Sequence, residues 1–119
     1  MSDPPRPQSP DVVDQIQMVL RYLERSLLAL EPVRPGYRYK YNQLRRLRDQ
    51  LEEAFVREQT ERLRLAAVDF THEVDQLRQV VSDLEQAARR AGQTREVLGY
   101  VSLAVEATTR VLATIVPLL

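Results

Sequence analysis

The chain contains neither proline nor glycine between residues 39 and 91, and this interval limits the folds open to it. Nearly every residue in the interval is a fair or good helix former. We therefore predict one continuous helix over about 39–91, which is about 50 residues and roughly 75 Å long at 1.5 Å per residue. The fold class that follows is all-α.

The apolar side chains of this interval fall into two sections, the first from Leu44 to Phe55 and the second from Leu63 to Ala88, spaced mostly by three or four residues. Between them the sequence REQTER, residues 57–62, is wholly polar. The apolar stripe drifts around the helix at this join. The two sections are therefore expected to face different neighbours, or the helix bends or breaks near 58–61.

Two shorter helices are predicted to flank the long one. The first covers about 10–31, with Ser9 as its cap, and Pro32 ends it because proline disfavours helical geometry in the residue before it. The third covers about 95–116 and follows Gly92, which is a typical left-handed helix stop. The predicted order of the helices is short, long, short.

The predicted domain structure is simple, since the chain has 119 residues. The proline-rich residues 1–9 are expected to form a flexible leader, and residues 10–119 a single helical domain. Two helical hairpins leave part of each apolar stripe uncovered, so we expect homo-oligomerisation to complete a helical bundle or coiled coil. The candidate oligomer interface consists of Leu63, Leu65, Val68, Phe70, Val101, Val105, Leu112, Ile115 and Val116.

The composition removes several classes of function. Cysteine is absent, which excludes disulfides, thiolate nucleophiles and cysteine metal sites. It also gives no sign of an oxidising compartment, so a cytoplasmic location is expected. Seventeen basic and seventeen acidic residues balance, so the chain as a whole has no field that would attract a polyanion. The first residues contain no apolar signal-peptide core.

The single histidine, His72, lies close in sequence to Asp69, Glu73 and Asp75. At 100° per residue, His72 points about 160° away from Phe70 at the centre of the apolar stripe, and Asp69, Glu73 and Asp75 do not converge with it on the core. Glycine-rich phosphate loops and nucleophile motifs are also absent. The sequence therefore predicts no catalytic residue, no metal site and no cofactor, and the protein is expected not to be an enzyme.

A basic segment with alternating tyrosines opens the long helix. Residues 33–48, VRPGYRYKYNQLRRLR, carry six cations and no acid. Cations at a helix start oppose the positive end of the helix dipole, and a bound phosphate would relieve this conflict. Tyrosine rings can also stack on unpaired bases. The candidate contacts for an anion or single-stranded nucleic acid are Arg34, Arg38, Lys40, Arg45, Arg46, Arg48, Tyr37, Tyr39 and Tyr41.

A structural explanation competes with this hypothesis. Antiparallel packing of the first helix would bring its negative dipole end and Glu31 next to the cations, with Glu24 about two turns back. Within the long helix, Arg48 can reach Glu52. Tyrosines beside a Pro-Gly corner commonly cover the end of a small core. Carboxylates close to the arginines would therefore weaken the nucleic-acid hypothesis.

The last predicted helix is the most apolar part of the chain. Residues 97–119 are long enough to span a membrane, but Glu106 and Arg110 would each cost on the order of 3 kcal/mol at the bilayer centre. Four positions apart, these two residues can pair on a water-facing stripe. We therefore expect a buried helix or an oligomer interface, and membrane association is the less favoured alternative.

These patterns predict a non-catalytic scaffold or adaptor that acts through apolar helix–helix interfaces. Its expected partner is a second copy of the chain or another helical protein. A small nucleic-acid-binding subunit that uses segment 34–48 is the first alternative. A membrane-associated helical module that uses residues 97–119 is the second.

Overall fold

The computed structural model describes residues 11–55, 62–90 and 94–118, and within these ranges the regular elements are helical. Residues 62–64 form a single helical turn. The longer elements, in chain order, are α1 (Val12–Leu30), the 3-10 helix η1 (Glu31–Gly36), α2 (Arg38–Glu53), α4 (Thr71–Arg89), α5 (Thr94–Ile115) and the 3-10 helix η2 (Val116–Leu118).

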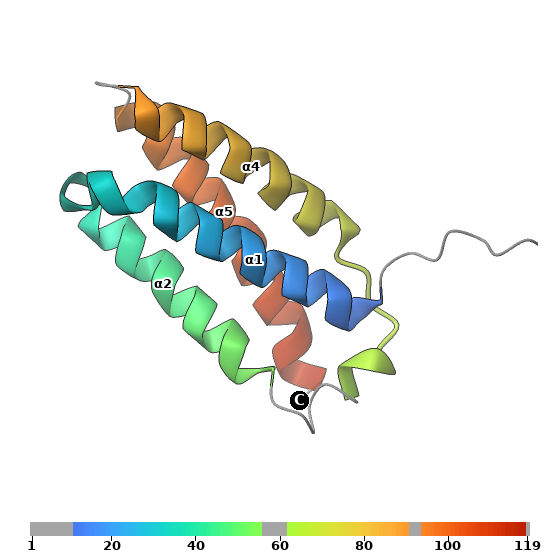
Figure 1. Ribbon diagram of the computed structural model, residues 1–119. Coiled ribbons are helices and arrows are strands. Elements are labelled where there is room, and N and C mark those ends of the chain that lie inside the picture. The colour runs from blue at the N-terminus through green and yellow to red at the C-terminus, as the bar shows by residue number, and fades with distance from the viewer. Residues whose placement is uncertain (1–10, 56–61, 91–93, 119) are drawn as a thin grey trace, which may run out of the picture.

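The four α-helices form a bundle, with α1 and α5 at opposite corners (Figure 1). Helix α1 packs on α2 and α4, and α5 packs on the same two helices. The chain makes two antiparallel hairpins, α1 with α2 and α4 with α5. Contacts between α1 and α4 advance together along both helices, from Gln15 with Asp69 to Arg25 with Glu85. Helices α1 and α4 are therefore parallel neighbours, and so are α2 and α5.

The core is built from one apolar stripe on each helix, as the spacing of apolar residues predicts. The stripe on α1 from Val12 to Leu30 is buried along its whole length. The crossover between the hairpins joins α2 to α4, and its described residues, 54–55 and 62–70, add apolar side chains to the same core. The largest fully buried side chains are Ile16, Val19, Leu23, Leu30, Leu44, Leu51, Leu63, Leu77, Val81, Leu84, Val101 and Ile115.

The predicted continuous helix over 39–91 is wrong. Helix α2 ends at Glu53 and α4 begins at Thr71, so the interval contains two helices on different corners of the bundle. The bundle therefore has four α-helices within the described residues, in place of the predicted three. A second copy is not needed to complete it, because the fourth stripe closes the core within one chain.

Burial of apolar side chains between α2 and α4 explains why the helix does not continue from Glu53 to Thr71. Ala54, Leu63 and Phe70, all in the crossover, are buried in the core. Burying a large apolar side chain contributes about 1.5–3 kcal/mol, whereas helix propensity differs by less than about 1 kcal/mol among ordinary residues. The predicted alternative of a break near 58–61 is closer to the structure. Those positions themselves belong to 56–61, outside the described residues.

The helix starts also differ from the prediction in detail. Asp11, rather than Ser9, caps α1, and its Oδ1 accepts a hydrogen bond from the Asp14 N–H at 2.9 Å. The predicted leader and the Gly92 stop lie outside the described ranges. The last helix runs from Thr94 to Ile115, within one residue of the predicted bounds.

The buried side chain of Gln15 joins the start of α1 to the start of α4. Its Oε1 accepts a hydrogen bond from the Phe70 N–H at 2.6 Å, and its Nε2 donates to Asp69 Oδ1 at 3.0 Å. The same carboxylate oxygen accepts from the hydroxyl and the N–H of Thr71. These hydrogen bonds, the one from the Thr71 hydroxyl above all, lower the pKa of Asp69. Together these groups satisfy backbone donors that the first turn of α4 leaves without helical partners.

Two leucines on α1 test the extent of the core. Leu23 is fully buried, whereas Leu28 is 72% exposed. We expect Leu23→Ala to lower the free energy of unfolding by about 2–5 kcal/mol. The matched change Leu28→Ala should stay within about 0.5 kcal/mol. Urea denaturation followed by circular dichroism measures both values, and equal losses would contradict the described core.

Two glutamines on the same helix test the link between the hairpins. Gln15→Leu leaves the buried Phe70 N–H without its acceptor and should cost about 1–3 kcal/mol. The control Gln17→Leu changes an exposed side chain and should have an effect below about 0.5 kcal/mol. Amide hydrogen exchange should also accelerate at Phe70 in the first variant. Unchanged exchange there would show that Gln15 does not hold the start of α4.

Candidate functional site

The three tyrosines of the basic segment do not share a surface. Tyr41 is buried, and its hydroxyl donates a hydrogen bond to Glu31 Oε2 at 2.8 Å. Tyr37 is partly buried, and Tyr39 is 78% exposed. Tyr39 and Tyr41 lie about 200° apart around α2, at 100° per residue, so one faces the bundle and the other faces solvent. Only Tyr39 of the three is fully available for stacking on a ligand.

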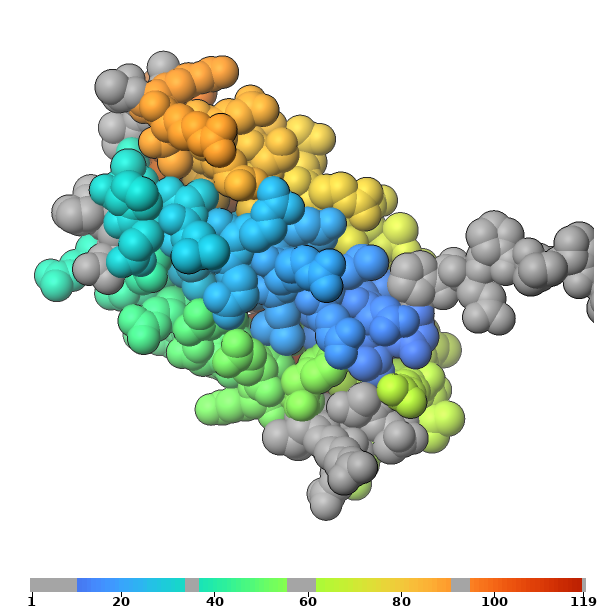
Figure 2. All heavy atoms as spheres, viewed as in Figure 1, coloured from blue at the N-terminus to red at the C-terminus, as the bar shows by residue number. Residues whose placement is uncertain are grey.

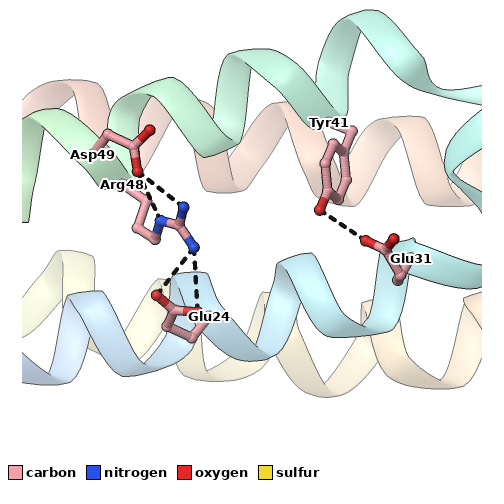
Figure 3. A network of polar contacts seen from close by, with 5 residues as sticks. All are labelled: Glu24, Glu31, Tyr41, Arg48 and Asp49. Carbon is pink, nitrogen blue, oxygen red and sulfur yellow. Dashed lines mark hydrogen bonds and ion pairs between the residues drawn. The ribbon is translucent and has the colours of Figure 1, made fainter.

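Arg48 is held in a network with two carboxylates (Figure 3). Its Nη1 lies 3.2 Å from Glu24 Oε1 on α1, and its Nη2 lies 2.9 Å from Asp49 Oδ1. The hydrogen bond to Asp49 is the main cause that raises the pKa of Arg48, and the negative charge of Glu24 adds to it. Arg48 therefore serves the α1–α2 contact.

The prediction that acids of the first helix lie next to these cations is thus confirmed for Arg48. The acid that lies next to it is Glu24, and not Glu31 at the end of the helix. Glu24 makes the ion pair, while Glu31 accepts from the Tyr41 hydroxyl. Both groups belong to the seam between α1 and α2 (Figure 3). Two of the nine candidate anion contacts, Arg48 and Tyr41, are therefore engaged in the structure, and the side chain of Arg34 lies outside the described part.

The remaining cations form a basic half on the outer surface of α2. Arg38, Arg45 and Arg46 are exposed, and Lys40 is partly buried. None of these four forms an ion pair with another described residue. The second half of α2 is acidic, with Asp49, Glu52 and Glu53 all exposed. The outer surface of α2 therefore changes from positive to negative along its length.

An apolar groove of about 350 Å³ lies between α2 and α5. It exists because these parallel helices meet along a seam that no other described helix covers. Val116, at the exit of α5, is 58% exposed at its edge. The groove is lined by Leu47, Gln50, Thr109, Leu112, Ala113, Val116 and Pro117.

The nine candidate interface residues divide between the core and the surface. Five of them are buried within the single chain, so their apolar character is explained by the bundle itself; these are Leu63, Phe70, Val101, Leu112 and Ile115. Val68 and Val105 are partly buried. Leu65 is 88% exposed in the crossover. The nine residues therefore do not form one surface, and an oligomer interface remains a prediction for the exposed members and for the groove.

A second hollow, of about 290 Å³, lies between the ends of α1 and α4. The exposed Leu28 stands on its α1 side, and Ala88 lies on its α4 side. Glu85, which also lines it, pairs with Arg25 across the two helices. One polar residue at the edge of this hollow therefore helps to hold α1 to α4. The two helices lie side by side on the surface in Figure 2.

The acids near His72 do not assemble a metal site. His72 is exposed on α4, and Asp69 is engaged by Thr71 and Gln15. Within residues 11–55, 62–90 and 94–118, no group of three or more histidine, aspartate or glutamate side chains is placed to hold a metal ion. Among the described side chains, no ion pair joins His72 to a carboxylate.

Helix α5 with η2, Arg95–Leu118, is long and apolar enough to cross a membrane by length and composition. The core helix of a soluble bundle meets the same criteria. Val101, Ala104, Val111 and Ile115 on α5 are fully buried against the other helices. Glu106 and Arg110 form an ion pair on its exposed side, as their spacing predicts.

Comparison of the chain with protein-family models finds no match. The same comparison with curated proteins and with solved structures also finds none. The groove between α2 and α5 is the feature that the sequence did not predict, because it depends on the two helices being parallel neighbours.

Proposed function

We propose that the protein is a non-catalytic scaffold or adaptor that binds a helical surface in the groove between α2 and α5. The observation that carries this proposal is an apolar groove on a bundle whose core is already closed. The absence of cysteine supports a place in the reducing cytoplasm.

The shape of the groove favours a helix as its occupant. Its lining comes from about one turn of α2, Leu47 to Gln50, from the end of α5, Thr109 to Ala113, and from Val116 and Pro117 of η2, so it runs along the helix axes. An apolar stripe laid along it would contact both helices at once, as in other helix-in-groove complexes. Covering exposed apolar surface contributes about 25 cal/mol for each Å².

Single-stranded nucleic acid is the second candidate ligand. The observation in its favour is the exposed Tyr39 on the same helix as Arg38, Arg45 and Arg46, which have no acidic partner among the described side chains. Phosphate contacts and one stacking ring are the elements of a weak, sequence-tolerant site. The acidic second half of α2 and the net charge of zero weigh against it.

The groove can be tested with a reporter, because a chain without cysteine allows a single labelling site. We expect a nitroxide at Ala113→Cys to lose mobility when a partner covers the groove. Ser82→Cys on the exposed side of α4 is the control and should stay mobile. Electron paramagnetic resonance is recorded while unlabelled protein, or soluble extract of the source cells, is added.

Adding Val116→Asp to the Ala113→Cys chain should prevent the immobilisation, because a carboxylate cannot enter an apolar interface without a partner. Val116 is largely exposed, so this change should leave the fold intact. The proposal fails if the Ala113 label stays mobile under every condition, or if the Ser82 label responds equally.

The nucleic-acid candidate is tested with a fluorescent single-stranded oligonucleotide at low salt. Binding should weaken steeply as salt is raised, because bound cations release counterions from the phosphates. Arg38→Ala with Arg45→Ala should weaken it about tenfold, whereas Arg21→Ala on α1 should not. Unchanged fluorescence anisotropy at low salt excludes this candidate.

A further inference from the structure

We infer that the partner in the groove is a second copy of this chain, packed antiparallel so that the α2–α5 seams of the two copies face each other. This inference rests on the proposed function and names the partner for the same groove. It is carried by the distribution of charge along α2. This distribution is complementary to that of a second α2 that runs in the opposite direction.

On the α2 side of the groove, the charged residues nearest to the lining residue Gln50 around the helix are Arg46 and Glu53. They are seven positions apart, which is about two helical turns, so they lie on the same side of α2. Gln50, which lines the groove, lies between them along the helix and within about 60° of each around its axis. Both charged side chains are exposed and have no ion-pair partner among the described residues. Within that part of the chain, the groove is therefore flanked by one unpaired cation and one unpaired anion.

A twofold axis near Gln50 satisfies both charges. Arg46 lies four positions before Gln50, and Glu53 lies three positions after it. In an antiparallel pair, Arg46 of each copy is level with Glu53 of the second copy, so the contact is made twice, as twofold symmetry requires. In a parallel twofold pair of facing seams, α2 would instead lie against α5 of the second copy, where Glu106 and Arg110 are already paired with each other. The charge order therefore selects the antiparallel arrangement.

The apolar side chains and the remaining charges agree with this arrangement. Face-to-face packing of the seams covers the largely exposed Val116 at the edge of the groove in both copies. Asp49 lies close to the twofold axis, where its counterpart would repel it, but Arg48 neutralises it within the same chain. Glu106 and Arg110 on α5 are already paired with each other.

A nucleic-acid strand matches this surface less well. The basic half of α2 would attract its phosphates, but the exposed Glu52 and Glu53 near the end of the same helix would repel them. A second copy presents a positive and a negative half in reverse order and so complements both. The polarity of α2 thus favours self-association over binding to a polyanion.

Charge reversal at the two flanking positions tests the inference. Sedimentation equilibrium should give twice the 13.8 kDa chain mass for the unmodified protein at micromolar concentration. We expect Arg46→Glu alone, or Glu53→Arg alone, to raise the dimer Kd about tenfold, because each replaces attraction by repulsion at two symmetric contacts. Arg45→Glu, the same charge change about 100° around the helix, should have a much smaller effect.

Mixing the two single variants gives the sharpest result. The Arg46→Glu chain then carries two anions beside its groove, and the Glu53→Arg chain carries two cations. A 1:1 mixture should therefore dimerise at least as tightly as the unmodified protein. The double change Arg46→Glu with Glu53→Arg should also restore the dimer. Single variants that dimerise normally, or a mixture that does not recover, would overturn the antiparallel pairing.

The outcomes also separate this inference from the proposed function. If the protein stays monomeric but cell extract immobilises the label at Ala113, a component of the extract covers the groove and the inference of a second copy is wrong. If neither extract nor protein changes the label, the inference and the proposed function fail together.

Discussion

The buried amide of Gln15 fixes the level at which α4 begins beside α1. Its oxygen accepts a hydrogen bond from the Phe70 N–H, and its nitrogen donates one to the Asp69 carboxylate. The start of α4 is therefore tied to the first turns of α1. The later contacts between the two helices, Tyr22 with Arg78 and Arg25 with Glu85, follow from that register. Because α4 occupies one side of α1 and α2 the other, α5 closes the bundle at the opposite corner. Helices α2 and α5 pack on each other there, and the groove lies along their seam.

Much of the fold can be predicted from the sequence, because the spacing of apolar residues indicates which side chains are buried. The stripe on α1 and the limits of α5 agree with the structure to within about two residues. The long central helix is wrong because the prediction relied on the absence of proline and glycine, and helix propensity is a weak constraint beside burial. Two signals were present: the polar run from residue 57 to 62, and Asp69, whose carboxylate accepts a hydrogen bond from the Thr71 N–H at the start of the new helix.

The candidate site is less predictable for a topological reason. Sequence spacing indicates that acids of the first helix lie near the cations of the second, and Arg48 with Glu24 confirms it. The groove needs Leu47 beside Leu112, which are far apart in the chain and meet only because the crossover makes α2 and α5 parallel. No local pattern contains that information. The charge reversal along α2 was visible in sequence, but its meaning depends on which side of the helix is covered.

The crossover also bears on the order in which the molecule folds. Contacts inside each hairpin join residues close in sequence, whereas the polar contacts between α1 and α4 join residues 54 to 60 positions apart. Closing so long a loop carries an entropic cost that local contacts do not share, and distant contacts slow folding. We expect the hairpins to form first and to dock afterwards. The Gln15 contacts would then form in that late step, so a chain that has not yet made them exposes the apolar faces of two finished hairpins.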